Sequence, residues 1–517
     1  MHLHPRIKHH ARRIHHHFRI ALLLIPLVLF AGYLCISYLL PTKPAKPLNV
    51  ILISIDSLRA DHMGIYGYSR DTTPHIDKWS KEAVVFNNYF STSHLTPISE
   101  VSVHTGKYPF TTGVVNFQET LPTSTPNLAR LLKDHGYQTA AFGTSPEFKG
   151  YNAGHSLSRG FDRYVFSEAT ASEFNGRDKN LIGDSIDWIS VVSASSSPFF
   201  LWLPIGSVHW PYGQSEPHHF SSSTYDGYFK TASKNTWKLV DHLFENTVFA
   251  RRGPQAKFEP IAQLGKNDFD FIVGRYDDGI LMTDRRIGQL FSFLKESGID
   301  KNTIVILESE HGEGLNERGY VLHYDIFDEQ THTPLIIKSP MLNPGRIDGL
   351  VSGVDIIPTL LALLTFPQIE TEGYDLSPYI MGRANNPREA VYITRTSMWE
   401  RVMSYYEGLE GFLALDDQEH FADVAIRTHD WKLIHRRAHR ALDRWAWHNN
   451  FRASPQSYSE YELYHLGTDP RETNNIYTRE RENPEIIYLE EKLKQWEREQ
   501  FKMKLPAQTT LEIQPYF

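Results

Sequence analysis

The sequence predicts an α/β protein whose core is a mainly parallel β-sheet covered by helices. Short apolar runs rich in β-branched residues alternate along the chain with helical patterns, and this alternation is typical of a parallel sheet. The chain has 517 residues, of which 41% are hydrophobic and 22% are charged, so it is long enough to bury a large core. No internal repeat with a period of about 20 to 50 residues is visible.

The first 47 residues differ from the rest, because they carry seven basic residues and no acidic ones. Residues 1–19 form a basic, His-rich segment, and residues 20–40 follow without any charge. At about 1.5 Å per helical residue, this uncharged run can cross a hydrocarbon layer of about 30 Å. The main alternative is a cleaved signal peptide, whose apolar region is normally about 7 to 15 residues long with a small-residue cleavage site behind it. "YLCISYLLPT" offers no such site, so we expect one transmembrane anchor.

The charges around this span predict its orientation. Five basic residues precede the span and two follow it closely, so the positive-inside rule places the N-terminus in the cytoplasm. Residues 41–47, "PTKPAKP", are typical of a stiff linker, and the chain from residue 48 onward is then expected outside, in the periplasm or the extracellular space.

The expected exported part has neither a disulfide nor a thiol nucleophile, because the only cysteine, Cys35, lies in the predicted span. It carries 46 basic residues against 61 acidic ones, and this negative balance argues against a nucleic-acid partner.

Several elements of the fold can be assigned from the sequence. Apolar runs predict five strands, in "NVILISI" (49–55), "TAAFG" (139–143), "FFLWLPIG" (199–206), "NTIVILES" (302–309) and "PLIIKS" (334–339). A helix is expected over 125–136, with Thr125 as its cap, Pro126 at its first position and Gly136 at its end. A second helix is expected over 284–298.

The same patterns predict the domain organisation. Residues 48–384 are expected to form the main domain, and within it residues 214–266 lack a clear period, which indicates an insertion. Residues 385–517 are expected to form a small C-terminal α+β subdomain that contains a helix over 482–500.

Two of the predicted strands run directly into side chains of the kind that bind metal ions. Asp56 follows the first strand in "ILISIDSLRAD", and Glu310 and His311 follow another in "VILESEHGEG". Because the carboxyl ends of parallel strands lie at one edge of the sheet, we expect these side chains to gather there. Carboxylate and imidazole together suit a divalent ion, whereas Asp56 alone fits a loop-start cap equally well.

At this point the sequence resembles the sulfatase branch of the alkaline phosphatase superfamily, from about residue 49 to residue 496. "NVILISIDSLRADHMGIYGYSRDTTPHIDKWSKEAVVFNNYFS" is similar to the opening of that family, and "TGKYP", "HWPY", "THTPLIIKSP" and "VSGVDIIPTLLAL" follow in the family order. "IRTHDWKLI" and "ELYHLGTDPRETNN" are similar to its small C-terminal subdomain. The resemblance implies a central sheet flanked by helices and a metal-dependent enzyme that acts on anionic esters.

The resemblance also identifies a candidate nucleophile. Sulfatases of this branch oxidise a Cys or Ser of a C-x-P-x-R type motif to formylglycine, nine residues before the Thr of "TG". The matching position here is Thr96, and the Pro and Arg of the motif fall on Ile98 and Glu100. The resemblance therefore implies no formylglycine. It implies that Thr96 attacks through its hydroxyl, as in the phosphatase and phosphotransferase relatives.

Thr96 is also expected to be the fourth ligand of one divalent ion held by Asp56, Glu310 and His311. Pro97 suits the first position of a helix, which would place Thr96 at the N-cap, where backbone N–H groups attract a phosphoryl oxygen. A simple helix cap is the alternative role of this residue. Ser57 stands where the family commonly has a second Asp, and losing this hard ligand favours Mn²⁺ or Zn²⁺ over Ca²⁺.

Two histidines complete the expected site. His209 in "VHWPY" is similar to the family His that contacts the anionic group or the leaving oxygen, and His323 falls where the family often has another. A histidine near a phosphoryl group can protonate the leaving oxygen. Because the chain has 26 His residues, a structural histidine is the alternative for each.

Three functions are consistent with these features. The first is a membrane-anchored, metal-dependent hydrolase, or a phosphotransferase of the cell envelope, that acts on phosphate esters through Thr96. The second is a sulfuric ester hydrolase that works without formylglycine. The third is a binding protein that keeps the fold without the chemistry, which the departures at Ser57, Glu100 and Glu310 leave open. A hydrolase is favoured, and the location favours an anionic ester of an envelope lipid or glycan as its substrate.

Overall fold

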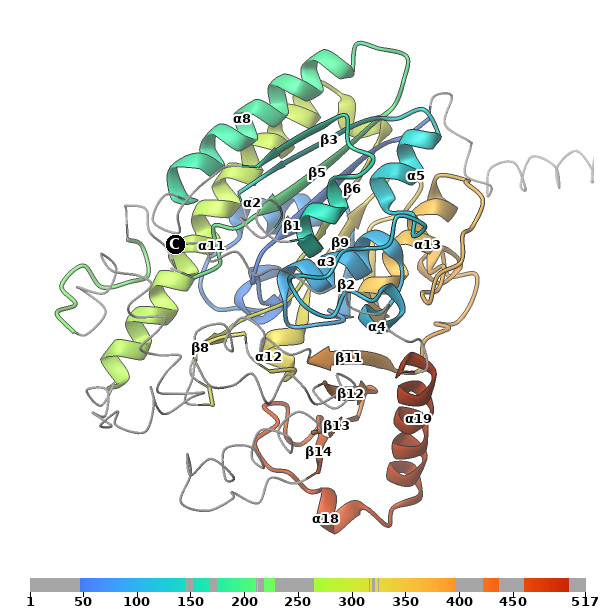
Figure 1. The fold of residues 1–517 in the computed structure, drawn as a ribbon. Helices are drawn as coiled ribbons and strands as arrows, with labels where there is room; N and C mark the ends of the chain where they lie inside the picture. Colours follow the sequence, from blue (N-terminus) through green and yellow to red (C-terminus); the bar gives the residue numbers. More distant parts are fainter. Residues whose placement is uncertain are drawn as a thin grey trace, which may run out of the picture. The chain divides into compact units, whose positions relative to one another are not determined.

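The central element of the structure is an eight-stranded sheet (Figure 1). The computed structural model describes residues 47–501 except 145–147, 149–151, 167–173, 211, 213–217, 228–264, 316, 319–320, 324, 396–421 and 437–459. The described residues from Leu48 onward belong to one compact unit. The sheet has the strand order β10-β2-β9-β6-β1-β5-β3-β4.

The strand β1 (Asn49–Ile55) lies in the middle of the sheet, parallel to β5 (Phe199–Ile205) on one side and to β6 (Thr303–Glu308) on the other. Beyond β5, the parallel pairing continues through β3 (Gln138–Gly143) to β4 (Arg163–Phe166). The fully buried β1, β5 and β6 read as continuous apolar runs, as expected for strands covered on both faces.

One strand departs from the parallel arrangement. β9 (His332–Lys338) runs antiparallel to both of its neighbours, β6 and β2 (Val84–Phe90), and β2 pairs in parallel with β10 (Gly345–Ser352). The predicted α/β fold with a mainly parallel sheet is therefore confirmed.

Helices cover the two faces of the sheet. One face carries α2 (Pro74–Ser80), α8 (Phe174–Val192) and α11 (Lys266–Glu296). The other carries α3 (Thr96–Thr105), α5 (Leu128–Asp134) and α13 (Ile356–Leu363).

Alternate side chains of β1 enter these two cores. Ile51 and Ile53 belong to the core of the face that carries α8 and α11. Val50 and Leu52 belong to the core under α3 and α13. Shorter elements complete this part of the chain: α4 (Pro109–Thr112), α7 (Asn152–His155), β7 (Gly314–Leu315), β8 (Val321–Leu322), α12 (Asp328–Thr331) and α14 (Ser377–Ile380).

The two helices predicted within the main domain exist, but their starts differ from the prediction. α5 begins at Leu128 and not at Thr125, because the side chain of Asn127 accepts a hydrogen bond from the Arg130 N–H and caps the helix there. α11 begins at Lys266, well before residue 284, and ends at Glu296, after which Gly298 takes a left-handed φ of 71°.

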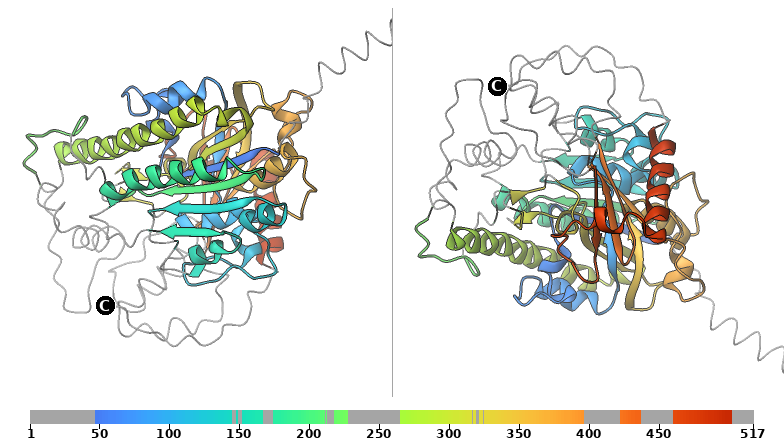
Figure 2. Two further views of the ribbon diagram at one scale, coloured as in Figure 1. Left: turned by 90° about the horizontal axis from the view of Figure 1, so that it is seen from above. Right: turned by 90° about the horizontal axis from the view of Figure 1, so that it is seen from below.

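A second, antiparallel sheet follows the main one. It comprises β11 (Val391–Arg395), β12 (Asp423–Arg427), β13 (Trp431–His435) and β14 (Tyr461–His465) in this order. The short α18 (Tyr477–Glu480) leads to α19 (Pro484–Phe501), the helix expected over 482–500, which packs on these strands (Figure 2). β11 is also tied to the main domain, because the Thr394 N–H donates to the Thr92 carbonyl oxygen at 2.9 Å.

Some predicted segments lie outside the described residues. These are the basic tail 1–19, the span 20–40, most of the linker 41–47 and most of the insertion 214–266. In the part of the chain that is described, no helix has the length and apolar character needed to span a bilayer. The anchor and the domain boundaries therefore stay predictions.

Candidate active site

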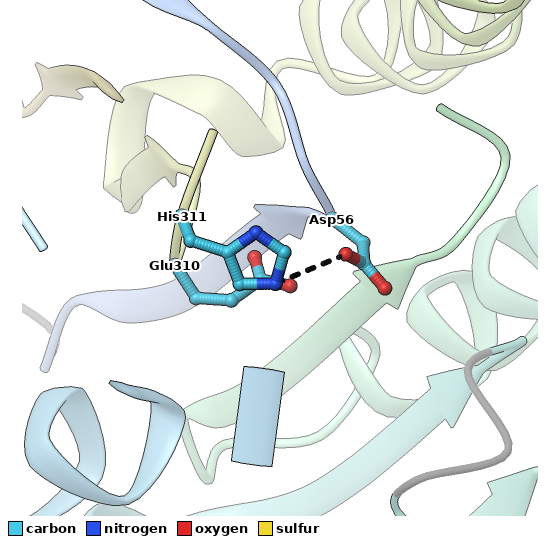
Figure 3. A group of neighbouring side chains, drawn as sticks. All are labelled: Asp56, Glu310 and His311. Atoms are coloured by element: carbon cyan, nitrogen blue, oxygen red, sulfur yellow. Dashed lines mark ion pairs between the residues drawn. The ribbon is translucent and has the colours of Figure 1, made fainter. Parts of the chain in front are cut away.

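Three adjacent parallel strands deliver polar side chains to one edge of the sheet. Asp56 comes directly after β1, His209 follows β5, and Glu310 and His311 follow β6. The ligand atoms of Asp56, Glu310 and His311 all lie within 4.8 Å of one another, and all three residues are buried (Figure 3). The structure therefore brings together the three side chains that the sequence placed at strand ends.

The imidazole of His311 is the centre of this group. Its Nε2 atom lies 2.9 Å from Thr96 Oγ1 and 3.6 Å from Asp56 Oδ1. Its Nδ1 atom lies 2.9 Å from the Gly312 carbonyl oxygen, which can only accept, so Nδ1 carries the hydrogen. The lone pair on Nε2 therefore faces Thr96 and Asp56. Burial and the nearby His323 lower the pKa of His311 well below its usual value, so the ring is neutral.

Thr96 is the first residue of α3 and is only 3% exposed. The expectation that it is the N-cap is wrong by one position, because the Leu95 carbonyl oxygen accepts the first helical hydrogen bond, from Ser99 N–H at 2.9 Å. Pro97 then occupies the second position. The Thr96 hydroxyl contacts His311 in place of capping the helix, which favours the chemical role over the capping role.

The residues of this group fit a divalent cation. Within the described structure, the buried Oε2 atom of Glu310 has no hydrogen-bond partner, although Glu310 is only 1% exposed. A buried carboxylate oxygen without a partner is costly unless a cation or a proton compensates it. Two carboxylates, one imidazole and one hydroxyl form a mixed oxygen and nitrogen set of the kind that Mn²⁺ or Zn²⁺ accepts.

The backbone beside Asp56 is strained. Ser57 has a φ of 63°, which is uncommon for a residue other than glycine. The Tyr276 hydroxyl holds this conformation, because it donates to the Ser57 carbonyl oxygen at 2.6 Å and accepts from the Arg59 N–H at 3.0 Å. The Ser57 hydroxyl donates to Asp56 Oδ1 at 3.1 Å. Strain of this kind is frequent at functional sites, and here it fixes the direction of a candidate ligand.

His209 and His323 also lie at this site. The ring of His323 is centred 4.1 Å from that of His311 and 5.1 Å from that of His209. Its Nδ1 atom lies 3.2 Å from Glu313 Oε1, and its carbonyl oxygen accepts a hydrogen bond from His94 Nδ1 at 2.8 Å. Both histidines named from the sequence are therefore close to the candidate ligands.

The environment shifts the acidity of the groups around His323. Burial, together with His209 and His94, lowers the pKa of His323 well below its usual value. Burial raises the pKa of Glu313 to about 8, although the nearby His209 acts in the opposite direction. Glu313 and His323 thus place a carboxyl and an imidazole in contact at a site that is shielded from water.

Sequence reasoning did not assign roles to Glu313, His94 and Tyr276. Glu313 lies two residues after His311, and His94 lies two residues before Thr96, so closeness to assigned residues was an available signal. Tyr276 lies on α11 with no local sign of its contact with Ser57, which depends on how the helix packs on the sheet.

Comparison with known proteins places this site in a family. Residues 48–366 match the Sulfatase family. The chain belongs to the sulfatase family. This confirms the resemblance seen in the sequence motifs, and it makes the protein a hydrolase of the alkaline phosphatase superfamily.

Two curated members of the sulfatase family are identical to this chain at about a quarter of the aligned positions. An ulvan-active sulfatase of Formosa agariphila is 26% identical over 368 residues, which cover 65% of this chain and 66% of the relative. An N-acetylglucosamine-6-O-sulfatase of Bacteroides thetaiotaomicron is 23% identical over 526 residues, which cover 88% of this chain and 87% of the relative.

Solved structures support the fold of this sulfatase-family protein. The phosphonate monoester hydrolase of Agrobacterium radiobacter superposes with a TM-score of 0.65 at 19% identity, covering 88% of this chain and 96% of the other. A protein solved in complex with its substrate D-glucosamine-2-N,6-O-disulfate superposes with a TM-score of 0.62 at 19% identity, covering 89% of this chain and 99% of the other.

Proposed function

We propose that the protein is a metal-dependent hydrolase that cleaves phosphate or sulfate esters with Thr96 as its nucleophile. The observation that carries the proposal is the 2.9 Å distance between Thr96 Oγ1 and His311 Nε2, with Asp56 and Glu310 beside the same imidazole. A threonine hydroxyl is a poor nucleophile near neutral pH and needs a base or a metal ion to activate it. A hydroxyl placed among three metal-type ligands meets this need.

Asp56, Thr96, Glu310 and His311 would hold one divalent ion, for which Mn²⁺ or Zn²⁺ is favoured over Ca²⁺. Bound there, the ion would lower the pKa of the Thr96 hydroxyl and offset the negative charge of the ester. The Ser57 hydroxyl would keep Asp56 in place.

The side chains of the site then have separate tasks. The positive end of the α3 dipole favours an anionic ester next to Thr96. Thr96 Oγ1 gives up its proton to solvent and forms a bond to phosphorus or sulfur while the bond to the alcohol oxygen breaks. His323 donates the proton that this leaving oxygen takes up and regains one at Nδ1 from Glu313, and His209 orients the anionic group. Water then attacks the covalent ester and releases Thr96.

Two ester classes are supported by different observations. The use of a hydroxyl nucleophile favours phosphate esters, as in the phosphatase relatives that the motifs resemble. The names of the two curated sulfatases favour sulfate esters of saccharides. We place phosphate esters first and sulfate esters second.

The proposal includes the membrane anchor at residues 20–40, with the N-terminus in the cytoplasm and the enzyme domain outside. An outward-facing enzyme at this position would act on an anionic ester of an envelope lipid or glycan. The expected result is that alkaline carbonate does not extract the full-length chain from membranes and that external protease degrades the part after residue 48. Extraction by carbonate, or protection from the protease, would contradict the anchor or its orientation.

The chemistry is tested with the metal-loaded full-length chain and a panel of phosphate monoesters, phosphate diesters and sulfate esters. We expect turnover of one class, and an intact-mass increase of the acid-quenched enzyme that maps to the peptide containing Thr96. Bound metal without turnover of any ester would contradict the hydrolase and leave a fold with a binding role.

A further inference from the structure

A second group of buried carboxylates shares Glu310 with the candidate active site. Glu100 on α3, Glu308 at the end of β6 and Glu310 are 0%, 0% and 1% exposed. Their carboxylate oxygens all lie within 4.8 Å of one another. Oxygen ligands bind Ca²⁺, Mg²⁺ or similar cations at about 2.0 to 2.6 Å, so three oxygens at these separations can contact one ion.

These carboxylates lack the partners that buried charges need. Both oxygens of Glu100, together with Glu308 Oε1 and Glu310 Oε2, have no hydrogen-bond partner in the described part of the chain. The second oxygen of Glu308 accepts from the Tyr89 hydroxyl at 3.4 Å, and the Ser54 hydroxyl lies near both Glu100 and Glu308. Across the described residues, no lysine or arginine pairs with Glu100, Glu308 or Glu310. An arrangement of this kind needs bound cations or added protons to be stable.

A buried histidine supplies an independent indication of a missing ligand. His104 lies one turn after Glu100 on α3 and is 0% exposed, and neither of its ring nitrogens has a hydrogen-bond partner among the described residues. Its Nε2 atom is directed at Glu100 and lies 3.5 Å from Oε2. The ring packs edge-on against Trp202 at 4.4 Å, which holds it in this direction. Buried imidazoles normally have a partner on at least one nitrogen, and a metal ion is a frequent one.

We propose that Glu100, Glu308 and Glu310 hold a second divalent cation, so that Glu310 bridges two ions of a binuclear centre. Glu310 is the one residue common to this group and to the group with Asp56 and His311. This inference goes beyond the proposed function, which needs only the ion beside Thr96.

The charge of the site supports two cations. Asp56 and the three glutamates supply four carboxylates, whose charge two divalent ions would neutralise. Three carboxylates form a hard ligand set, and His104 can add a nitrogen ligand after a small shift, so Mn²⁺ and Mg²⁺ fit this second position. Pairs of ions about 3.5 to 4 Å apart occur in other enzymes that act on phosphate esters. The second cation would also offset the negative charge of Glu100, which lies close to the expected position of an anionic substrate.

The test is the stoichiometry of Mn²⁺ binding to the full-length chain, measured by equilibrium dialysis and elemental analysis after the protein has been stripped with a chelator. Electron paramagnetic resonance reports independently whether the bound ions are coupled. We expect two Mn²⁺ per chain with an exchange-coupled spectrum. Glu100→Gln and Glu308→Gln are each expected to bind one Mn²⁺ with an uncoupled six-line spectrum. Glu370→Gln is the matched control, because that carboxylate is 95% exposed, and it should still bind two.

Each other outcome is informative. One Mn²⁺ per wild-type chain would overturn the second site, leave the first site intact, and indicate that the three glutamates share protons. No bound Mn²⁺ would contradict the second site together with the metal-dependent function. Two Mn²⁺ in both Glu→Gln variants would place the second ion elsewhere. If a variant does not fold, as judged by circular dichroism, the wild-type stoichiometry and spectrum still decide between one and two ions.

Discussion

The Oε1 atom of Glu313 lies 3.2 Å from the Nδ1 atom of His323, and Glu313 is fully buried. In the proposed mechanism, this contact fixes which nitrogen of His323 faces the ester. We predict that Glu313→Gln lowers kcat about 10- to 100-fold for esters with a poorly acidic alcohol, because protonation of such leaving oxygens contributes by about this factor or more. The nitrophenolate that leaves from a nitrophenyl ester needs no protonation, so kcat for these esters should change little. An equal loss for both kinds of ester would indicate that Glu313 acts on structure and not on proton transfer.

Replacing the candidate nucleophile should separate chemistry from binding. We predict that Thr96→Ala lowers kcat by at least about a thousandfold, because removal of a nucleophile leaves only binding and electrostatic effects. Thr96→Ser keeps the hydroxyl and should retain measurable turnover. Thr111→Ala on α4 is the control, since that hydroxyl donates to Gln500 Oε1 at 3.1 Å and is not one of the candidate site residues. Turnover of Thr96→Ala at the wild-type rate would show that another group attacks the ester.

Removing a candidate metal ligand should lower the affinity for the metal ion, and any loss of kcat should follow from the loss of bound metal. We predict that Asp56→Asn weakens Mn²⁺ binding by at least about 100-fold. Residues that only hydrogen-bond to a metal ligand already change metal affinity by roughly 10- to 100-fold, and loss of a residue that contacts the metal directly should cost more. Equilibrium dialysis against increasing Mn²⁺ measures this change directly. Asp71→Asn, at an exposed carboxylate, should bind Mn²⁺ like the wild type. Unchanged affinity in Asp56→Asn would exclude Asp56 as a ligand.

A buried ion pair joins Asp355 of the predicted main domain to Arg388, which follows the predicted boundary at residue 384. Arg388 Nε donates to Asp355 Oδ2 at 2.7 Å, a second guanidinium nitrogen pairs with Oδ1, and both side chains are buried. We predict that Arg388→Leu lowers the free energy of unfolding by about 3 to 5 kcal/mol, because it leaves Asp355 as an unpaired buried charge. Urea denaturation measures the loss, and adding Asp355→Asn should recover part of it. Arg130→Leu, which breaks an exposed pair with Asp134, should cost less than about 1 kcal/mol.

The stability of the fold should depend on pH through Asp284. This buried side chain accepts hydrogen bonds from the His75 and Ile76 N–H groups at the start of α2. Burial raises its pKa to about 7, above its ordinary value of 3.8. The folded protein therefore binds this proton more tightly than the unfolded chain, and the contribution of Asp284 to stability falls as the pH rises from about 4 to about 7.

The Asp284→Asn variant should lose this pH dependence. Denaturation midpoints at pH 5 and pH 8 should differ by less in the variant than in the wild type. The variant should be less stable than the wild type at both pH values, because the amide nitrogen of Asn cannot accept the second hydrogen bond. Asp134→Asn, at an exposed carboxylate, controls for a general effect of charge. An unchanged difference between the two pH values in Asp284→Asn would contradict the raised pKa.

Five of the eight strands of the main sheet could be assigned from the sequence, because buried strands are apolar without interruption, whereas β2, β4 and β10 were not assigned. The run 49–55 coincides with β1. Helix starts were harder, since Asn127, and not Thr125, caps α5, and both residues are good caps in isolation. The antiparallel direction of β9 could not be read from "PLIIKS", because an apolar run has the same appearance in either direction.

Site residues that directly follow a strand could be predicted from the sequence. Those whose position depends on the packing of distant elements could not. Asp56, Glu310 and His311 were found because each ends a strand or follows it closely. Glu308 was overlooked because it lies within an apolar strand, and the strand alternation that turns it toward Glu100 becomes visible only with α3 in place. The hydrogen bond from the Tyr276 hydroxyl to the Ser57 carbonyl oxygen joins residues 219 positions apart, and no local sequence pattern predicts it.

The hydrogen bond from Thr394 N–H to the Thr92 carbonyl oxygen has a consequence for how such proteins can change over time. Residues 91–95 connect β2 to the helix that begins with Thr96, so the loop before the candidate nucleophile contacts the edge of the C-terminal sheet. A gene shortened before β11 would lose this support and would encode a poorer catalyst as well as a smaller protein. We therefore expect selection for turnover to preserve the C-terminal sheet through its support of the loop before Thr96, so that the two sheets are inherited together.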